Sequence, residues 1–544
     1  MPYALGVVLV STLFLAGFLL YARLSRVQHM RAFPGPPRGS LLTGNLEDMF
    51  NPLAIAFHTH VTNLYGRVVK INGFLGDIQL YISDTKALTH LYLKNADSFE
   101  SDDFTVSLGM VSFGPGVFGS AGDLGKEHHR QRKLLMPIFS TPNLRNFHNI
   151  FTDLAVRFQD VFREMVMNAS TGTGEVDIMP WATRLSLELI GVVGFGHSFN
   201  GLKDDKDEYA HAICRLFPTI SKMQRWAPLL PLVRQHLPSA VLRWLAEAAP
   251  WEAMHEAIDI IDTGHKGALM VMEETKAIIR SAEKGSKGDT EGPNVTSTFR
   301  MLLQANAALP KESRLSESEL VAQVNSILFA GTEASTVTIA RILLSLSERP
   351  QLQETLRQEV LSADGFDHDR LMSLPLLDAV YKETMRAYPP VHLLPKQALK
   401  DVVLPFRLPV TRTDGSEVNE VFIPKGAICI VNIAGVNRSV DIWGPDAHEW
   451  KPERWLSPLP DSVVEAEVPT LFAHTLSFSA GRRACIGSKF AHIATKTVIA
   501  RLLAEFEFKP TDHKIIWKAG VIVSPWLENG LRPSLPLYVS PLKK

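Results

Sequence analysis

The longest hydrophobic pattern in the chain lies between Ser316 and Glu348 and has helical spacing. Ser316 and Glu319 have the spacing of a capping box, and Pro350 is expected to stop the helix. The apolar positions cover so much of the circumference that this helix is predicted to run through the core. They are Leu320, Val321, Val324, Ile327, Leu328, Ile339, Ile342, Leu343 and Leu346. Gly331, near the middle, costs about 1 kcal/mol relative to alanine, so it indicates a close approach to the backbone there unless its presence is accidental.

Two further patterns set the expected fold class. Helical periodicity covers most of residues 125–390 and includes a helix at about 375–388. Between residues 67 and 83, β-branched and aromatic side chains are interrupted by Gly73 and Gly76, which predicts strands of a small sheet. The sequence therefore predicts one mainly α unit with a smaller β-rich N-terminal lobe.

The N-terminal segment predicts a membrane anchor. Residues 1–22 contain no charged side chain, and 22 helical residues at about 1.5 Å each match a hydrocarbon core of roughly 30 Å. A cleaved signal peptide is the alternative, but a basic region before the apolar run is missing. Arg23, Arg26 and Arg31 follow the run, which places the rest of the chain in the cytosol by the positive-inside rule. The expected divisions are an anchor at 1–22, a basic and proline-rich connector at 23–40 and one globular domain at 41–544.

Charge and cysteine content exclude several classes of protein. Lys and Arg number 56 against 57 Asp and Glu, which leaves no overall basic field for nucleic-acid binding. Cys214, Cys429 and Cys485 lie far apart, and their odd number fits neither a disulfide framework nor a zinc finger. Only Cys485 has unusual neighbours, in the stretch FSAGRRACIG at 478–487. A lone cysteine there is a buried hydrophobe, a nucleophile or a metal ligand.

Glu383 and Arg386 are three residues apart and lie on one face of the helix predicted at about 375–388. Alone they would form a surface ion pair worth well under 1 kcal/mol. Arg454 follows in the turn KPERW at 451–455. A carboxylate shared by two arginines can be buried, because the extra donors satisfy its lone pairs.

Together these features resemble the cytochrome P450 family, the heme-thiolate monooxygenases, over essentially the whole chain. FSAGRRACIG is similar to the family's heme-binding loop, and FAGTEAS at 329–335 to its oxygen-activation segment. Glu383, Arg386 and Arg454 match its Glu-Arg-Arg structural triad. The anchor and proline connector look like a microsomal member, and HHRQRKLLMPIF at 128–139 looks more fungal than animal. The resemblance implies the cytochrome P450 fold and makes 41–544 a heme-thiolate catalytic domain.

The resemblance also implies how heme b is held. Cys485 would be the axial ligand of the heme iron as a thiolate, with Phe478 and Gly481 shaping its loop. Heme propionates would be bound by Arg483 and by three further residues, two of which depart from the family. These three are Arg132, His128 in place of the usual tryptophan and Lys396 in place of the usual arginine. A histidine can still donate a hydrogen bond, whereas a lysine offers a point charge instead of a fork.

A third departure affects the expected chemistry. Ala334 stands where the family normally has a threonine that takes part in proton delivery. Glu333 and, as the weaker candidate, Ser335 are therefore expected to carry that role, with help from a substrate hydroxyl or an ordered water. Expected substrate-pocket residues, by family position, are Phe104, Phe113, Val117, Phe118, Phe329 and 391–394.

The expected reaction is the insertion of one oxygen atom from O2 into an apolar secondary metabolite or xenobiotic. Because the chain contains no flavin or nicotinamide fingerprint, electrons would come from NADPH through a separate flavoprotein reductase at the endoplasmic reticulum membrane. Two alternatives remain open. One is a heme-thiolate isomerase or dehydratase that acts without O2, which the absence of threonine at Ala334 would permit. The other is a non-catalytic heme or lipid carrier.

Overall fold

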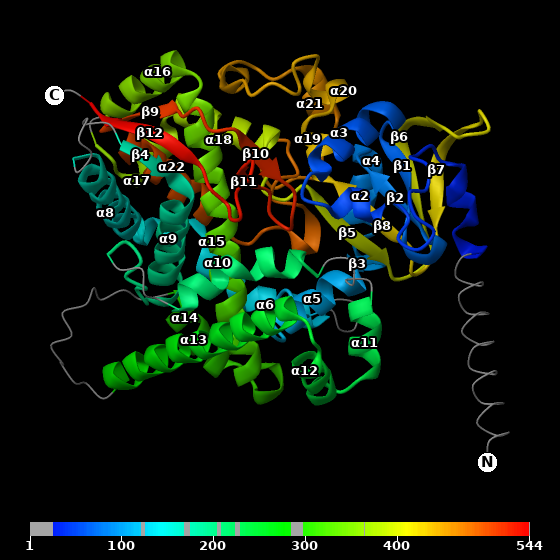
Figure 1. Cartoon of the computed structure of the whole chain (residues 1–544), viewed down its shortest axis with the longest axis horizontal. Coiled ribbons are helices and arrows are strands. Elements are labelled where there is room, and N and C mark those ends of the chain that lie inside the picture. The colour runs from blue at the N-terminus through cyan, green and yellow to red at the C-terminus, as the bar shows by residue number, and fades with distance from the viewer. Residues whose placement is uncertain are drawn as a thin grey trace.

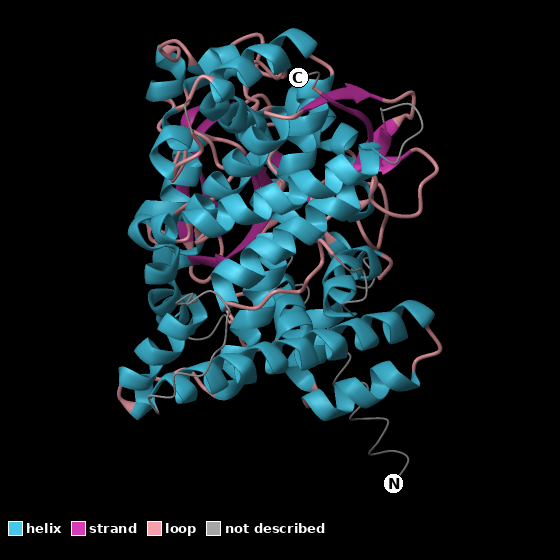
Figure 2. Cartoon of the chain, turned by 90° about the vertical axis from the view of Figure 1, so that its left-hand side faces the viewer, coloured by secondary structure: helices cyan, strands magenta, loops and turns pink. Residues whose placement is uncertain are grey.

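A computed structural model describes residues 25–120, 126–167, 174–203, 208–223, 229–283, 298–363 and 365–542. The expected anchor at 1–22 lies outside the described residues. Helices dominate one side of the molecule and a sheet-rich lobe forms the other (Figure 1). A view turned by 90° shows that helices cover most of the helical side, with strands between them and near the C-terminal end (Figure 2). The predicted fold class, mainly α with a smaller β-rich lobe, is confirmed.

Long helices build the larger part. They are α8 His148–Met167, α9 Ile178–Ile190, α10 Glu208–Ser221, α13 Glu252–Glu283, α14 Thr298–Ala308, α15 Glu317–Ser347, α16 Pro350–Leu361, α18 Pro375–Ala387 and α22 Ser488–Leu503. The other α-helices of the described residues are α2 Leu46–Phe50, α3 Ala54–Tyr65, α4 Thr85–Thr89, α5 Asp103–Phe113, α6 Lys126–Leu135, α7 Thr141–Asn146, α11 Leu230–His236, α12 Ser239–Ala248, α17 His368–Ser373, α19 Ile433–Asn437, α20 Val440–Trp443 and α21 Asp461–Glu465.

The helix α15 runs through the core, as its apolar pattern predicts. Ser316 is its N-cap, and the capping box with Glu319 is formed in both directions. Its neighbours are α9, α13 and α22. A Cβ on Gly331 would lie 2.7 Å from Cγ1 of Ile190, so the predicted close approach to this glycine is that of α9. The small residue therefore lets two core helices pack closely.

The sheet-rich lobe combines segments from both ends of the chain. One five-stranded sheet has the order β1-β2-β8-β5-β3. Its strands are β1 Val68–Asn72, β2 Ile78–Ile82, β3 Phe99–Ser101, β5 Leu393–Ala398 and β8 Ile428–Asn432. The antiparallel pair β1 and β2 confirms the strands predicted at 67–83, and the parallel pairing of β2 with β8 joins Leu80 to Cys429. The lobe is thus not N-terminal alone.

Three smaller sheets complete the strand inventory of the described residues. They are β6 Val402–Thr411 with β7 Glu417–Ile423, β10 Ile515–Lys518 with β11 Ser524–Leu527, and the sheet β4 Gly174–Asp177, β12 Pro536–Pro541 and β9 Phe506–Pro510. The last sheet contacts α8 and α22. The hairpin β10–β11 is tied to the turn before β5, because Val523 N–H donates to the carbonyl of Pro390 at 2.9 Å.

Two described segments are long and apolar enough to cross a membrane, at Ile178–Phe195 and Lys311–Ser347. Most of each segment is buried inside the protein. They correspond to α9 with the turn after it and to α15 with the turn before it, and both belong to the main hydrophobic core. Their apolar composition is explained by that burial.

Candidate functional site

The loop around Cys485 lies just before α22 and is closed on itself. The Cys485 N–H donates to the carbonyl of Phe478 at 2.8 Å, and the ring of Phe478 packs on that of Phe472 at 5.3 Å between centroids. Gly481 has φ of 64°, and a Cβ there would lie 2.4 Å from the carbonyl oxygen of Tyr92. Only glycine fits this position without displacing the backbone of Tyr92.

The thiol of Cys485 is free and exposed, although its neighbour Ala484 is buried. Burial among surrounding protein atoms raises its pKa, while the N–H of Gly487 and the charge of Arg132 lower it. Cys429, in contrast, is buried within β8, and burial raises its pKa to about 12. An accessible sulfur that lies deep in the fold therefore faces a space inside the protein. Of these two cysteines, only Cys485 can present its sulfur to a ligand.

Cationic side chains gather beside this loop. Burial lowers the pKa of His128 on α6 to about 2, and the charges of Arg483, Arg132 and Lys396 lower it further. Burial also lowers the pKa of Lys396 on β5 to about 8, with Arg483 acting in the same direction. Within the part of the chain that the structure describes, neither Arg132 nor Lys396 has a hydrogen bond or an ion pair. The structure thus brings together all four residues that are predicted to bind the heme propionates.

Arg483 has partners that sequence reasoning missed. Its guanidinium forms an ion pair with Glu100 on β3, and it donates to the carbonyls of Ser120 at 2.6 Å and Val117 at 3.3 Å. Glu100 neutralises one of three cations, which leaves Arg132 and Lys396 without a protein carboxylate in contact. Lys396 is buried and Arg132 is half-buried, and two cations of this kind fit the two carboxylates of a heme. The accessible sulfur and this cationic group therefore fit a heme, while the individual roles stay predictions.

One face of α15 is accessible in the middle of an otherwise buried helix. Between Leu320 and Ser347 every residue is buried except five, and these five are Ala330, Gly331, Glu333, Ala334 and Arg341. At 100° per residue they fall within one half of the helix circumference. Ser335 is buried and lies outside this face. Glu333 is therefore the better placed of the two residues predicted to deliver protons.

Glu333 is also a titratable group on this face that has no hydrogen-bond or ion-pair partner among the described residues. Burial raises its pKa to about 7. The neighbouring hydroxyls are engaged, because Thr332, Thr336 and Thr338 donate to the carbonyls of Leu328, Thr332 and Ala334. A carboxyl that titrates near neutral pH can both take up and release a proton. None of these threonines replaces the hydroxyl that is missing at Ala334.

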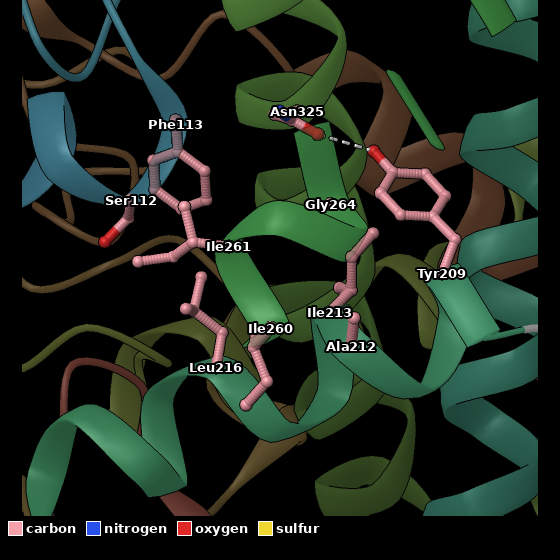
Figure 3. A pocket seen from close by; sticks show the side chains of 10 residues that line it. All are labelled: Ser112, Phe113, Tyr209, Ala212, Ile213, Leu216, Ile260, Ile261, Gly264 and Asn325. Atoms are coloured by element: carbon pink, nitrogen blue, oxygen red, sulfur yellow. Dashed lines mark hydrogen bonds between the residues drawn. The ribbon is translucent and has the colours of Figure 1, made fainter. Parts of the chain in front are cut away.

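Several predicted pocket residues come together beside this face. The ring of Phe113 lies 5.2 Å from that of Phe329 and 5.7 Å from that of Phe118. Phe113 also lines a small crevice of about 20 Å³ between α5, α10, α13 and α15, where Tyr209 donates to Asn325 at 2.8 Å (Figure 3). Val391 and Leu394 instead pack against the core of the sheet-rich lobe, and Leu393 against a third cluster. The structure thus groups Phe113, Phe118 and Phe329 and places Val391, Leu393 and Leu394 against other clusters.

The three residues of the predicted structural triad lie together, and Arg454 has a second carboxylate partner. Arg386 and Glu383 are fully buried and form two parallel bonds, Nε to Oε2 at 2.8 Å and Nη2 to Oε1 at 2.7 Å. Glu383 also accepts from the N–H of Lys451 at 2.8 Å and from Nε1 of Trp455 at 2.9 Å. Arg454 lies 3.5 Å from Glu383 but donates to Asp446 at 2.8 Å. The carboxylate of Glu383 is therefore satisfied without a hydrogen bond from Arg454.

Comparisons with known proteins agree with this geometry. The family model described as Cytochrome P450 matches residues 34–525. A cytochrome P450 monooxygenase 81 of Postia placenta is 37% identical over 96% of this chain and 95% of its own length. A ganoderic acid synthetase of Ganoderma lucidum is 34% identical over 94% of this chain and 93% of its own. A cytochrome P450 monooxygenase of Hericium erinaceus is 31% identical over 98% of this chain and 97% of its own.

Proposed function

Because the chain belongs to the cytochrome P450 family and is a monooxygenase of that family, we propose that its substrate is an apolar organic molecule that receives one oxygen atom from O2. Heme b is the proposed cofactor, and the proposed electron source is NADPH through a separate flavoprotein reductase. The observation that supports this most is the accessible Cys485 sulfur beside the cationic group of Arg132 and Lys396. The relatives are named as monooxygenases, which does not favour the alternative of an isomerase or a dehydratase.

Each residue of the site has a distinct proposed role. When bound, the heme supplies the chemistry that activates O2, and a thiolate ligand favours cleavage of the O–O bond. Cys485 provides that thiolate, and the N–H of Gly487 supports its negative charge. Arg132, Lys396 and Arg483 hold the propionates, with His128 as a neutral hydrogen-bond partner. Glu333 holds a proton at its carboxyl oxygen on the accessible face of α15.

The proposed location is the endoplasmic reticulum membrane, with one N-terminal anchor and the catalytic domain in the cytosol. Support comes from the uncharged run at residues 1–22 and from Arg23, Arg26 and Arg31 after it. The relatives are named as cytochrome P450 monooxygenases of Postia placenta and Hericium erinaceus and as a ganoderic acid synthetase of Ganoderma lucidum. A secondary metabolite or a xenobiotic is the proposed class of substrate.

The function is tested with the full-length chain, reconstituted in lipid vesicles with a fungal NADPH-dependent reductase. A panel of apolar compounds is screened by the spin-state change of the heme, and compounds that bind are tested for turnover. The expected result is product that contains one oxygen atom, with matched consumption of NADPH and O2. Product formed without any O2 consumption would move the function to the isomerase or dehydratase class. Absence of substrate-dependent NADPH use across the panel would favour a carrier.

Glu333→Gln is expected to lower the product formed per NADPH consumed by about tenfold or more, because an acid-base group of this kind contributes a factor of about 100 or more. The ratio in the wild type is expected to change with pH around 7, where Glu333 titrates. The matched control is Glu348→Gln at the exposed C-cap of the same helix. An unchanged ratio and turnover rate in Glu333→Gln would remove Glu333 from proton delivery.

Glu333→Gln is also expected to make the folded protein more stable at high pH. The pKa of Glu333 rises from 4.5 to about 7 on folding, so the folded state binds more protons between these values and loses stability as the pH rises. Glu333→Gln removes that loss. The variant should match the wild type at pH 4 and exceed it by about 2–3 kcal/mol at pH 8. Urea unfolding at both pH values measures the difference.

A further inference from the structure

The loop of residues 114–120, which follows α5, contacts both the cationic group and the aromatic pocket residues. Its carbonyls at Val117 and Ser120 accept hydrogen bonds from the guanidinium of Arg483, at 3.3 and 2.6 Å. Its Phe118 belongs to the group of packed aromatic rings described above. The loop is therefore shared by the proposed propionate site and the proposed pocket, and its position determines that of the Arg483 guanidinium.

Gln131 on α6 holds both ends of this loop. Its side chain is buried, and all four hydrogen-bonding positions of its amide are used. The Nε2 donates to the carbonyl of Pro115 at 2.9 Å and to Oε1 of Glu319 at 3.0 Å. The Oε1 accepts from Oγ of Ser120 at 3.4 Å and from Nε2 of Gln323 at 3.0 Å. One buried amide thus connects the loop to two residues of α15.

Gln323 on α15 holds the middle of the loop. It is buried, and its Oε1 accepts from the N–H of Val117 at 3.3 Å. The loop backbone lies so close to α15 that a Cβ on Gly116 would be 2.9 Å from the carbonyl oxygen of Ala322. Val117 therefore has its N–H on Gln323 and its carbonyl on Arg483. A displacement of the Gln323 side chain would reach Arg483 through the backbone of a single residue.

The other end of this polar network is fixed at the start of α15. Glu319 accepts the N–H of Ser316 at 2.8 Å as part of the capping box, and it forms an ion pair with Arg130 on α6. Each member of the network thus has a partner in the protein, and a buried network that is fully bonded favours one arrangement of its members. An apolar residue at Gln323 would leave the N–H of Val117 without its acceptor.

We propose that Gln131 and Gln323 are positioning residues for the monooxygenase reaction. By fixing the 114–120 loop against α15, they hold the guanidinium of Arg483 in the orientation in which it binds a heme propionate. They act through the carbonyls of Val117 and Ser120 and not by contact with the heme. The inference rests on the proposed function, because that function assigns a propionate to Arg483.

The test measures the transfer of heme from the full-length holoprotein to an excess of apomyoglobin, followed by absorbance. Gln323→Leu should accelerate heme loss about tenfold, which is about the factor that one charge-assisted hydrogen bond contributes. Gln131→Leu should act in the same direction. The matched control is Gln353→Leu, because Gln353 on α16 is an equally buried glutamine that binds the backbone of Phe508. It should lower the Tm as Gln323→Leu does, but leave the rate of heme loss unchanged.

A double-mutant cycle tests whether Gln323 acts through Arg483. Arg483→Lys keeps the positive charge, but a lysine lacks the planar fork that binds both carbonyls of the loop. In that background Gln323→Leu should change the rate of heme loss by less than about twofold, because the contact through which it acts is already lost. Fully additive effects of the two substitutions would overturn the proposal, as would equal acceleration in Gln353→Leu.

Gln323→Glu keeps the shape of the side chain and tests its two hydrogen bonds. A protonated glutamate offers one acceptor and one O–H donor and can replace both bonds, whereas an ionised glutamate has no donor for Gln131. Burial favours the protonated form. Relative to the wild type at the same pH, heme loss from this variant should be unchanged at about pH 6 and faster at about pH 9. A ratio to the wild-type rate that is the same at both pH values would overturn the proposal.

The proposed function is measured separately on the same preparations. The wild type should show the red-shifted band of the reduced, CO-bound state and consume O2 with NADPH and reductase. If it does both, but Gln323→Leu loses heme no faster than Gln353→Leu, only the positioning role is wrong. If the wild type does neither, the proposed function itself fails.

Discussion

Replacing Glu383 by alanine is expected to leave little folded protein. Removing one partner of a buried ion pair costs about 3–5 kcal/mol, which is a large share of the 5–15 kcal/mol that stabilises a typical domain. Arg386 would lose both of its bonds to Glu383 while fully buried, and Lys451 N–H and Trp455 Nε1 would lose their acceptor. The yield of soluble protein and its urea unfolding curve measure the effect.

The matched control for this prediction is Glu453→Ala, which removes an exposed glutamate from the neighbouring turn Pro452–Trp455. Its effect should stay within about 0.5 kcal/mol. Glu383→Gln distinguishes the role of the negative charge of Glu383 from that of its shape. The side-chain amide of glutamine can still accept the hydrogen bond from Trp455 Nε1, but it cannot neutralise the charge of Arg386. A Glu383→Ala protein that is as stable as the wild type and merely turns over slowly would place Glu383 in the chemistry and contradict the folding role.

Cys485→Ala is expected to abolish the red-shifted absorption band that reduced, CO-bound heme shows when its other axial ligand is a thiolate. Alanine offers no ligand to the iron, so activity with O2 and NADPH should fall to background. The loop itself should survive, because the bond from the residue 485 N–H to the carbonyl of Phe478 does not involve the sulfur. Far-ultraviolet circular dichroism of the variant checks that the fold is kept.

Cys429→Ala provides the matched control for the cysteine prediction. Cys429 is buried in β8, and its loss should cost about 1 kcal/mol of packing without any change in the band. Retention of the band in Cys485→Ala would show that another residue ligates the iron. Loss of the band in Cys429→Ala with an intact fold would contradict the assignment as well.

Local signals in the sequence predict much of the fold because they depend on neighbours in the chain. Ser316 and Glu319 are three residues apart, and their capping box begins α15 as predicted. Gly73 lies directly after β1 in the connection to β2, where the interruption of β-branched residues predicts a break. The loop around Cys485 is equally local, since its closing bond spans seven residues. Such features need no knowledge of the rest of the chain.

Partners that are distant in sequence could not be predicted in the same way. The carboxylate that contacts Arg483 is Glu100, in a three-residue strand with no motif of its own. Arg454 forms the predicted ion pair with Glu383, 71 residues away, at 3.5 Å, and in addition a hydrogen bond to the nearer Asp446 that no motif indicated. The environment of Arg341 could not be predicted from the sequence either, because Trp517 and Tyr388 stack on its guanidinium only in the folded protein.

The parallel pairing of β2 with β8 determines how long β2 stays without its partner strand during synthesis on the ribosome. Ile82 pairs with Val431, about 350 residues later in the chain. At about 5–20 residues per second, the first strand emerges roughly 20–70 s before its partner exists. During that interval one edge of β2, with buried residues such as Leu80, has no strand to pair with. This edge of β2 therefore stays without its partner strand until nearly four fifths of the chain has been made.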